Sequence, residues 1–181
     1  MSSEVKTEKT AKEKLGQALG RVASGVYVVT FSRDGKADGM LTTWIQQMSF
    51  EPPMLVVGVK NGRQLLDGLG KGDKFTVNVL SKKSMDVFKA FAKPYTEGMD
   101  RFEGLNISAN PTHGTECDGK HTHHDGLGPI FKNCVSYLNC AVDQVVNAGD
   151  HSVVVVEVTE GGMVEGDGEP MVHLRASGFQ Y

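Results

Sequence analysis

The chain has 181 residues, of which 39% are hydrophobic and 23% charged, as in ordinary single globular domains. Its formal net charge of −3 excludes the strongly basic surface that proteins use to bind nucleic acid without sequence preference. The longest apolar runs, such as 54–57 and 153–156, are far shorter than the roughly 20 residues that cross a bilayer. We therefore expect a protein that associates with neither nucleic acid nor membrane.

The N-terminal residues predict a tail followed by a helix. Residues 1–9 carry charge but almost nothing to bury, which is typical of a disordered tail, and no apolar stretch predicts a secretory signal, so we expect a cytoplasmic protein. Thr10 and Glu13 have the spacing of a capping box at the start of an amphipathic helix. We expect one domain over residues 10–181.

Strand signals dominate the next part of the chain. Residues 26–31 and 40–45 are two extended runs on either side of Asp34-Gly35, which predicts a hairpin. The Pro-Pro pair at 52–53 excludes a helix, and residues 54–59 are typical of a buried strand. Residues 64–69 form at most a short helix.

Residues 75–80 alternate along another predicted strand, with Phe75 on one face and Asn78 on the other, which indicates that the second face meets polar groups. Ser84 is placed to cap a helix that ends near Pro94. Residues 94–129 lack periodicity and predict a long excursion within the domain.

Three further strands are predicted at 135–142, 153–158 and 171–175. Short connections between strands favour antiparallel pairing, so we expect a mainly β fold, closed or partly closed into a barrel, with a few peripheral helices. The three cysteines have no metal-binding or redox spacing, which predicts reduced thiols, and Cys140 alternates with apolar neighbours as a buried side chain.

Two motifs suggest chemistry that we do not expect. The glycines of 68–72 resemble a dinucleotide-binding loop, but they precede a strand where such a loop follows one, so they predict a turn. The segment 113–125 concentrates His and Cys, yet neighbouring imidazoles on an extended chain point to opposite sides. We expect no metal site.

The segment 39–53 combines a strand, two adjacent hydroxyl groups, the one Trp of the chain and a Pro-Pro corner, a mixture suited to a flat heterocycle with a phosphate tail. With this segment, the chain resembles the flavin reductase-like family with the FMN-binding split β-barrel, whose strand order is Greek-key-like. In particular it is similar to the C-terminal flavin reductase module of diflavin flavodiiron proteins. The matching pieces follow one another at 25–30, 42–53, 74–80, 100–102, 149–151 and 173–178.

The resemblance implies an FMN groove at the interface of a homodimer. It implies flavin contacts from the backbone amides of Met40, Thr42, Thr43 and Trp44, and a rim shaped by Ser49 and Pro53. Lys60 and Arg63 stand where the family often binds the flavin phosphate, with plain solvent exposure as the alternative for each.

Four more residues are implied with open roles. Asn78 and His151 are candidates to face the flavin or a nicotinamide, with a turn-capping role as the alternative for His151. Lys93 and Arg101 are candidates to bind the phosphates of a nicotinamide nucleotide, with plain solvent exposure as their alternative.

The implied activity is hydride transfer from NADH or NADPH to the flavin, followed by electron transfer to free flavin, oxygen or a redox partner protein. In such a reaction the cofactor supplies the reactivity, so no catalytic acid or base is expected. The alternative is a flavin-binding electron carrier, flavoredoxin-like, that does not use nicotinamide directly. The sequence does not separate these two hypotheses.

Overall fold

A computed structural model describes residues 9–33, 36–96, 98–108 and 126–180 of the chain. Residues 1–8 of the predicted tail at 1–9 and the His-rich segment 113–125 lie outside the described residues, so both stay predictions. The chain divides into two compact units, one formed by residues 1–24 with 172–181 and the other by 25–171.

The smaller unit consists of helix α1 (Ala11–Gly20) and the C-terminal segment, which lie in close contact. The capping box is confirmed: the Thr10 hydroxyl accepts from the Glu13 amide at 3.3 Å, and the Thr10 amide donates to the Glu13 carboxylate at 2.7 Å. The Gly178 amide donates to Gly16 O at 2.6 Å, and a Cβ on Gly20 would lie 2.5 Å from Arg175 O. The two helix glycines therefore permit this approach.

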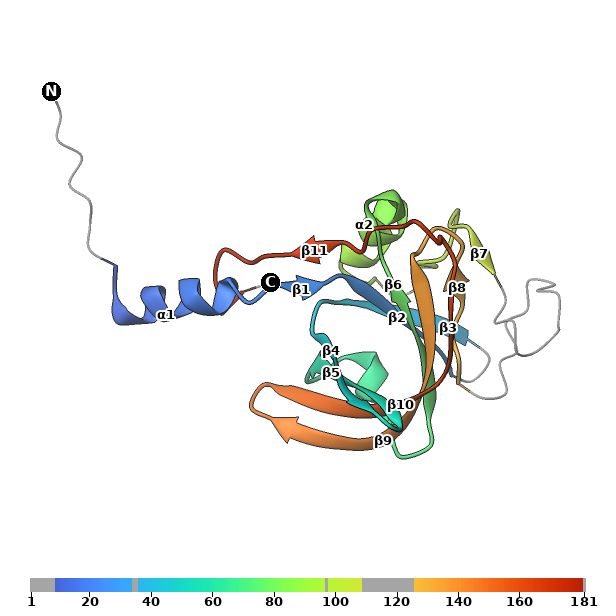
Figure 1. The fold of residues 1–181 in the computed structure, drawn as a ribbon, viewed down its shortest axis with the longest axis horizontal. Helices are drawn as coiled ribbons and strands as arrows, with labels where there is room; N and C mark the ends of the chain where they lie inside the picture. The colour runs from blue at the N-terminus through green and yellow to red at the C-terminus, as the bar shows by residue number, and fades with distance from the viewer. Residues whose placement is uncertain (1–8, 34–35, 97, 109–125, 181) are drawn as a thin grey trace, which may run out of the picture. The chain divides into compact units, whose positions relative to one another are not determined.

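The larger unit is built on one antiparallel sheet of seven strands in the order β3-β2-β6-β9-β10-β5-β4. Its strands are β2 (Tyr27–Arg33), β3 (Lys36–Thr42), β4 (Ile45–Phe50), β5 (Pro53–Lys60), β6 (Lys74–Val79), β9 (Ser136–Ala148) and β10 (His151–Met163). Figure 1 shows the long β9–β10 hairpin extending from the neighbourhood of β6 to that of β5 and β4.

The remaining elements are short. Two small sheets pair β1 (Ser24–Gly25) with β11 (Val172–His173) and β7 (Ile107–Ser108) with β8 (Ile130–Phe131). The helical turns are η1 (Gln64–Leu66) and η2 (Lys82–Ser84), and η2 leads into helix α2 (Met85–Ala92). Among the described helices, none is long and apolar enough to cross a membrane.

The hairpin of β2 and β3 is confirmed, but its second strand ends earlier than predicted. Residues 40–45 do not form one strand: β3 stops at Thr42, and β4 begins at Ile45 and pairs with β5. Thr43 and Trp44 connect the two edges of the sheet. Local β propensity cannot show this break, because the residues on both sides of it favour extended backbone.

Ser84 occupies the N-cap position of α2, as predicted, but its side chain makes no capping hydrogen bond there. Its hydroxyl donates to Asn133 O at 2.7 Å, while the Ser81 hydroxyl accepts from the Lys83 amide at 3.1 Å and caps η2. Helical structure therefore begins at Lys82 in η2, before the start of α2 at Met85.

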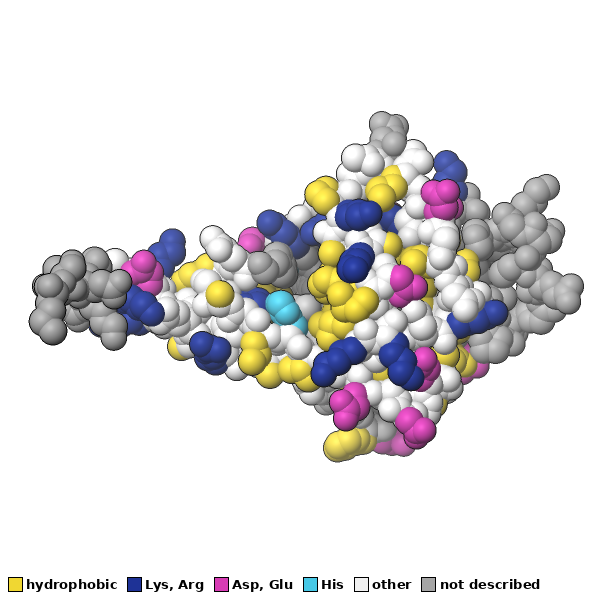
Figure 2. All heavy atoms as spheres, turned by 90° about the horizontal axis from the view of Figure 1, so that it is seen from above, with side chains coloured by type: hydrophobic (Ala, Val, Ile, Leu, Met, Phe, Trp, Pro, Cys, Tyr) yellow, Lys and Arg dark blue, Asp and Glu magenta, His cyan; other side chains and the backbone are white. Residues whose placement is uncertain are grey.

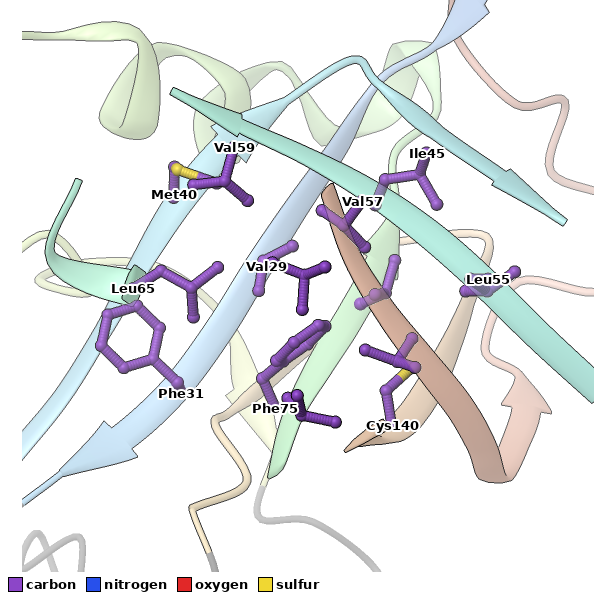
Figure 3. Packing of buried hydrophobic residues seen from close by; sticks show 14 residues of the cluster. Val29, Phe31, Met40, Ile45, Leu55, Val57, Val59, Leu65, Phe75 and Cys140 are labelled. Carbon is purple, nitrogen blue, oxygen red and sulfur yellow. The ribbon is translucent and has the colours of Figure 1, made fainter. Parts of the chain in front are cut away.

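The main core lies on the inner face of the curved sheet. Val29, Val57 and Phe75 are fully buried, and Figure 3 shows their side chains gathered in one region with Cys140. The predicted alternation is confirmed, because Cys140 and Val154 point into this core. Burial of such side chains supplies about 1.5 to 3 kcal/mol each.

A second core of aromatic rings lies under α2. The Phe91 ring centroid is 5.4 Å from that of Phe102 and 5.7 Å from that of Phe131, both in edge-to-face arrangement. Phe102 lies within the predicted 94–129 excursion and Phe131 in β8 just after it, so these contacts attach described parts on both sides of the undescribed residues 109–125 to α2.

The fold class is thus mainly β, as predicted. The hydrogen-bonded ladder does not close, because β3 and β4 remain its two edges.

Candidate functional site

Trp44 occupies the connection between β3 and β4 and covers a glycine of the neighbouring strand. The Gly58 amide donates to Trp44 O at 2.8 Å, and a Cβ on Gly58 would lie 3.0 Å from the indole Cε3. Any larger side chain at 58 would push the indole away. The half-buried indole therefore packs directly on β5 at Gly58.

The imidazole of His151 lies against this indole. The two ring centroids are 4.6 Å apart with an interplanar angle of 37°. His151 Nδ1 lies 2.8 Å from an Asp150 carboxylate oxygen, and this hydrogen bond lowers the pKa of Asp150, as does the nearby charge of Lys60. Asp150 thus stays ionised and orients a buried imidazole beside the aromatic surface.

Two basic side chains surround the turn that follows β5. Lys60 is paired with His151 in the sheet register, and the Arg63 amide donates to Lys60 O at 3.3 Å. The turn is joined to the β9–β10 turn, since the Asn61 amide donates to Asp150 O at 3.0 Å. Lys60 and Arg63 are both exposed, so this end of β5 offers two cations beside Trp44 and His151.

The outer edge of β3 supplies hydrogen-bonding groups. Gly39 O accepts from Arg101 Nη1 at 3.1 Å, so the backbone of Gly39 faces away from β2. In an antiparallel ladder this direction alternates, so Leu41 also faces outward, whereas Met40 and Thr42 face β2. Next to this edge, the hydroxyl of Thr43 is buried and has no hydrogen-bond partner among the described residues.

Several predicted residues lie elsewhere. The Met40 side chain is in the main core (Figure 3), and its amide, like that of Thr42, is directed into the ladder, so neither amide is available to a ligand. The Thr42 hydroxyl instead accepts from the Trp44 amide at 3.4 Å. Ser49 and Pro53 are at the far end of the β4–β5 hairpin, about 23 Å along β5 from Lys60.

Asn78 is fully buried and bonded to protein on all sides. Its amide nitrogen donates to Val28 O, Thr30 Oγ1 and Pro129 O, and its oxygen accepts from the Phe131 amide at 3.1 Å. The prediction of a polar second face on this strand is confirmed. However, both polar atoms of the side chain are bonded to protein, so Asn78 has a structural role here and does not contact the Trp44–His151 pair.

Lys93 and Arg101 lie near α2 and β3. Lys93 is exposed at the C-terminal end of α2. The Arg101 guanidinium carbon lies 5.0 Å from the Tyr95 ring centroid, in addition to the bond to Gly39 O. Gly39 is four residues from Thr43, about 13 Å along the strand. Arg101 therefore lies away from the cluster of Trp44, Gly58 and His151, but on the same edge of the sheet.

The structure adds three positions that the sequence prediction omitted, namely Gly58 under the indole, Asp150 beside His151 and the outward amide of Leu41. Gly58 carried a usable signal, since a lone glycine inside a strand often marks close approach by another group. The direction of the Leu41 amide had no signal, because it depends on which residues of β2 it pairs with.

The sequence matches the family described as "Flavin reductase like domain" over residues 19–180. The chain belongs to this family. It is 29% identical over 181 residues to "Diflavin flavoprotein A 1" of Synechocystis sp., and the match covers 99% of this chain. It spans only 29% of the length of that relative.

Solved structures of other proteins share the fold. The NADH:FAD oxidoreductase SgcE6 of Streptomyces globisporus has a TM-score of 0.70 at 22% identity, covering 90% of this chain and 86% of the other. The styrene monooxygenase flavin reductase of Pseudomonas putida S12 has a TM-score of 0.67 at 22% identity, covering 87% and 90%.

Proposed function

We propose that this chain is a flavin reductase that holds FMN against Trp44 and reduces it with NADH or NADPH. The observation that carries the proposal is the Trp44–His151 ring pair on Gly58, with Lys60 and Arg63 at the end of the same strand. Family membership supports the same reaction class.

The residues present fit such a cofactor. An isoalloxazine ring needs a flat apolar contact and backbone donors at its polar edge, which Trp44 and the outward amide of Leu41 supply. The buried Thr43 hydroxyl lacks a partner, and a hydrogen bond from a ligand would remove the cost of leaving it unpaired. Lys60 and Arg63 suit a phosphate dianion.

Bound FMN would supply the hydride acceptor of the reaction. The protein has three tasks around it. Trp44 gives a rigid surface that fixes the plane of the ring, and the outward β3 edge fixes its orientation within that plane. His151, held by Asp150, places its imidazole beside that surface, on the side proposed to face the flavin or the nicotinamide. No residue of this cluster needs to act as a general acid or base.

The nicotinamide nucleotide is proposed to approach along the β3 edge. The Streptomyces relative has also been solved with NAD and FAD fragments, which supports a family site for both molecules. Arg101 and Lys93 would then be reached by nucleotide phosphates beyond Thr43. We propose FMN and not FAD because Lys60, at the end of β5, and Arg63, in the turn after it, supply two cations, which suit a single phosphate.

We further propose that the functional unit is a homodimer. Edge strand β4 exposes 56% of Met48 and 87% of Phe50, and β9 exposes 47% of Val146. β4 is an edge of the sheet, and exposed apolar side chains on an edge strand are typical of a surface that a second chain covers. Ser49 and Pro53 lie by this surface and would reach a flavin only from the other subunit.

The competing hypothesis is an electron carrier that does not use nicotinamide. Anaerobic stopped-flow spectroscopy distinguishes it from the proposed reductase. FMN-loaded protein is mixed with NADH or NADPH in the absence of any partner. We expect bleaching of the flavin band with at least one nucleotide within seconds. If neither nucleotide bleaches the flavin while dithionite does, the carrier hypothesis replaces the reductase.

A further inference from the structure

The solvent face of α2 concentrates positive charge on a chain that is negative overall. Between residues 82 and 93 the sequence carries four lysines and a single carboxylate, whereas the whole chain has a formal net charge of −3. Met85 and Lys89, four residues apart, lie on one face of α2, and the exposed Lys82 in η2 and Lys93 just after the helix flank them in sequence. We call Lys82, Met85, Lys89 and Lys93 the α2 face.

This face is exposed because the opposite side of the helix is used for packing. Val87 and Phe91 are buried, and a Cβ on Gly39 would lie 2.7 Å from the Phe91 ring, so α2 rests directly on β3. The orientation of the α2 face toward solvent is therefore determined by the aromatic core below it.

The lysines surround apolar side chains that are left open. Met85 is 40% exposed, and Tyr95 and Met99, which follow the helix, are 44% and 36% exposed. Figure 2, which looks down on the side that carries α2, shows hydrophobic side chains next to several Lys or Arg side chains. An apolar centre with charges around it is the arrangement of a protein-binding surface.

We infer that the α2 face docks an acidic protein that takes electrons from the reduced flavin. The positive charge of the face favours a partner with a negative surface, because like charges across an interface repel and opposite charges speed association. The location fits delivery of electrons, since α2 packs on β3, the strand that ends at Thr42, directly before Thr43 and Trp44. This inference rests on the proposed function.

The step balances with the nicotinamide as reductant. Each NADH gives two electrons, reduces two one-electron acceptors such as ferric haems, and leaves NAD⁺ and one proton. No further oxidant or reductant is required.

The test compares two haem proteins of opposite charge, acidic cytochrome b5 and basic cytochrome c, as acceptors. The variant Lys82→Glu/Lys89→Glu reverses the α2 face, and Lys9→Glu/Lys36→Glu makes the same charge change at exposed lysines elsewhere. NADH- or NADPH-driven haem reduction is followed at ionic strengths from about 0.02 to about 0.3 M, which shortens the screening length.

We expect wild-type reduction of cytochrome b5 to fall at least tenfold as salt rises, and the α2-face variant to be at least tenfold slower at low salt. The control variant should stay within about threefold of wild type, and the α2-face variant should not be slower with cytochrome c. Reduction of riboflavin, which is uncharged, should be the same in all three proteins.

The inference is overturned if cytochrome b5 reduction is independent of salt or equal in both variants while riboflavin is still reduced. If neither nucleotide reduces the bound FMN, the proposed function fails instead, and docking is then measured with flavin reduced by dithionite. Light scattering tests whether a second copy of this chain, and not an acidic protein, binds the α2 face. If the α2-face variant becomes monomeric while the control variant stays dimeric, the face serves self-association and the inference is overturned.

Discussion

At the scale of single residues, the proposed phosphate site at Lys60 and Arg63 predicts a preference for FMN over riboflavin. Lys60→Ala or Arg63→Ala is expected to weaken FMN binding about ten- to a hundredfold, because each removes a charge-assisted hydrogen bond to phosphate worth about 1.5 to 3 kcal/mol. Riboflavin lacks the phosphate, so its affinity should change little. Titration of both flavins measures the difference. Lys71→Ala, which removes an exposed lysine paired with Asp143, is the control.

Equal losses for FMN and riboflavin in these variants would place the phosphate elsewhere.

Gly58 tests the position of the indole. A Cβ at position 58 would lie 3.0 Å from the indole Cε3, and the two methyl groups of valine need still more room. Gly58→Val should therefore displace the indole and weaken FMN binding at least tenfold. Trp44 is the only tryptophan, so its fluorescence reports the site directly, and its emission should shift to longer wavelength. Gly70→Val, where the Cβ meets open space, is the matched control. Unchanged emission and affinity in Gly58→Val would contradict the proposed stacking surface.

The two described cysteines should be unreactive in the folded protein. Burial raises the pKa of Cys134 and of Cys140 to about 12, so at pH 8 only about one thiol in ten thousand is ionised. Iodoacetamide should leave both unmodified until urea is added, as peptide mass spectrometry shows. Because the folded pKa lies above the unfolded value of about 8.5, these thiols favour folding below that pH and progressively less as the pH rises toward 12.

Modification of either cysteine at the rate of a free thiol in the native protein would show that the core opens at that position.

At the scale of elements, Asn78 joins strands β2 and β6 to the end of the long excursion. Asn78→Ala leaves the buried Phe131 amide and Thr30 hydroxyl with fewer partners, and we expect a loss of about 2 to 4 kcal/mol in unfolding free energy. Urea denaturation measures this loss. Asn106→Ala, at an exposed position, should cost under about 0.5 kcal/mol.

The same variant separates two roles of Asn78. FMN affinity at low temperature should be unchanged if its role is structural. A large loss of affinity with normal stability would restore Asn78 to the flavin site.

At the scale of the whole molecule, the exposed apolar side chains of β4 predict a dimer. Light scattering at saturating FMN should give about twice the chain mass of 19.5 kDa. Phe50→Asp should shift the mass toward the monomer, because Phe50 is 87% exposed and would be buried in the interface. Met163→Asp, at a residue 62% exposed on β10, should leave the dimer intact. A wild-type protein of monomer mass would contradict the dimer.

Local chemistry in the sequence was sufficient for several elements. The Thr10–Glu13 capping box, the β2–β3 hairpin and the inward alternation of Cys140 with its neighbours depend on residues close in sequence, and all three are confirmed. Strands β9 and β10 were predicted too short. Register shifts between 155 and 156 and between 158 and 160 interrupt their alternation, and local patterns cannot bridge such bulges.

The sequence by itself determined the fold class, the flavin reductase-like family and a set of candidate ligands, because composition, periodicity and motif order are properties of the chain. Only the tertiary structure decided which candidates share a site. Trp44, Gly58 and His151 come from three segments that the sheet register brings together, while the same register directs the Met40 amide inward and Asn78 into a buried network. Register depends on pairing between distant strands, and a shift of one residue would reverse every one of these directions.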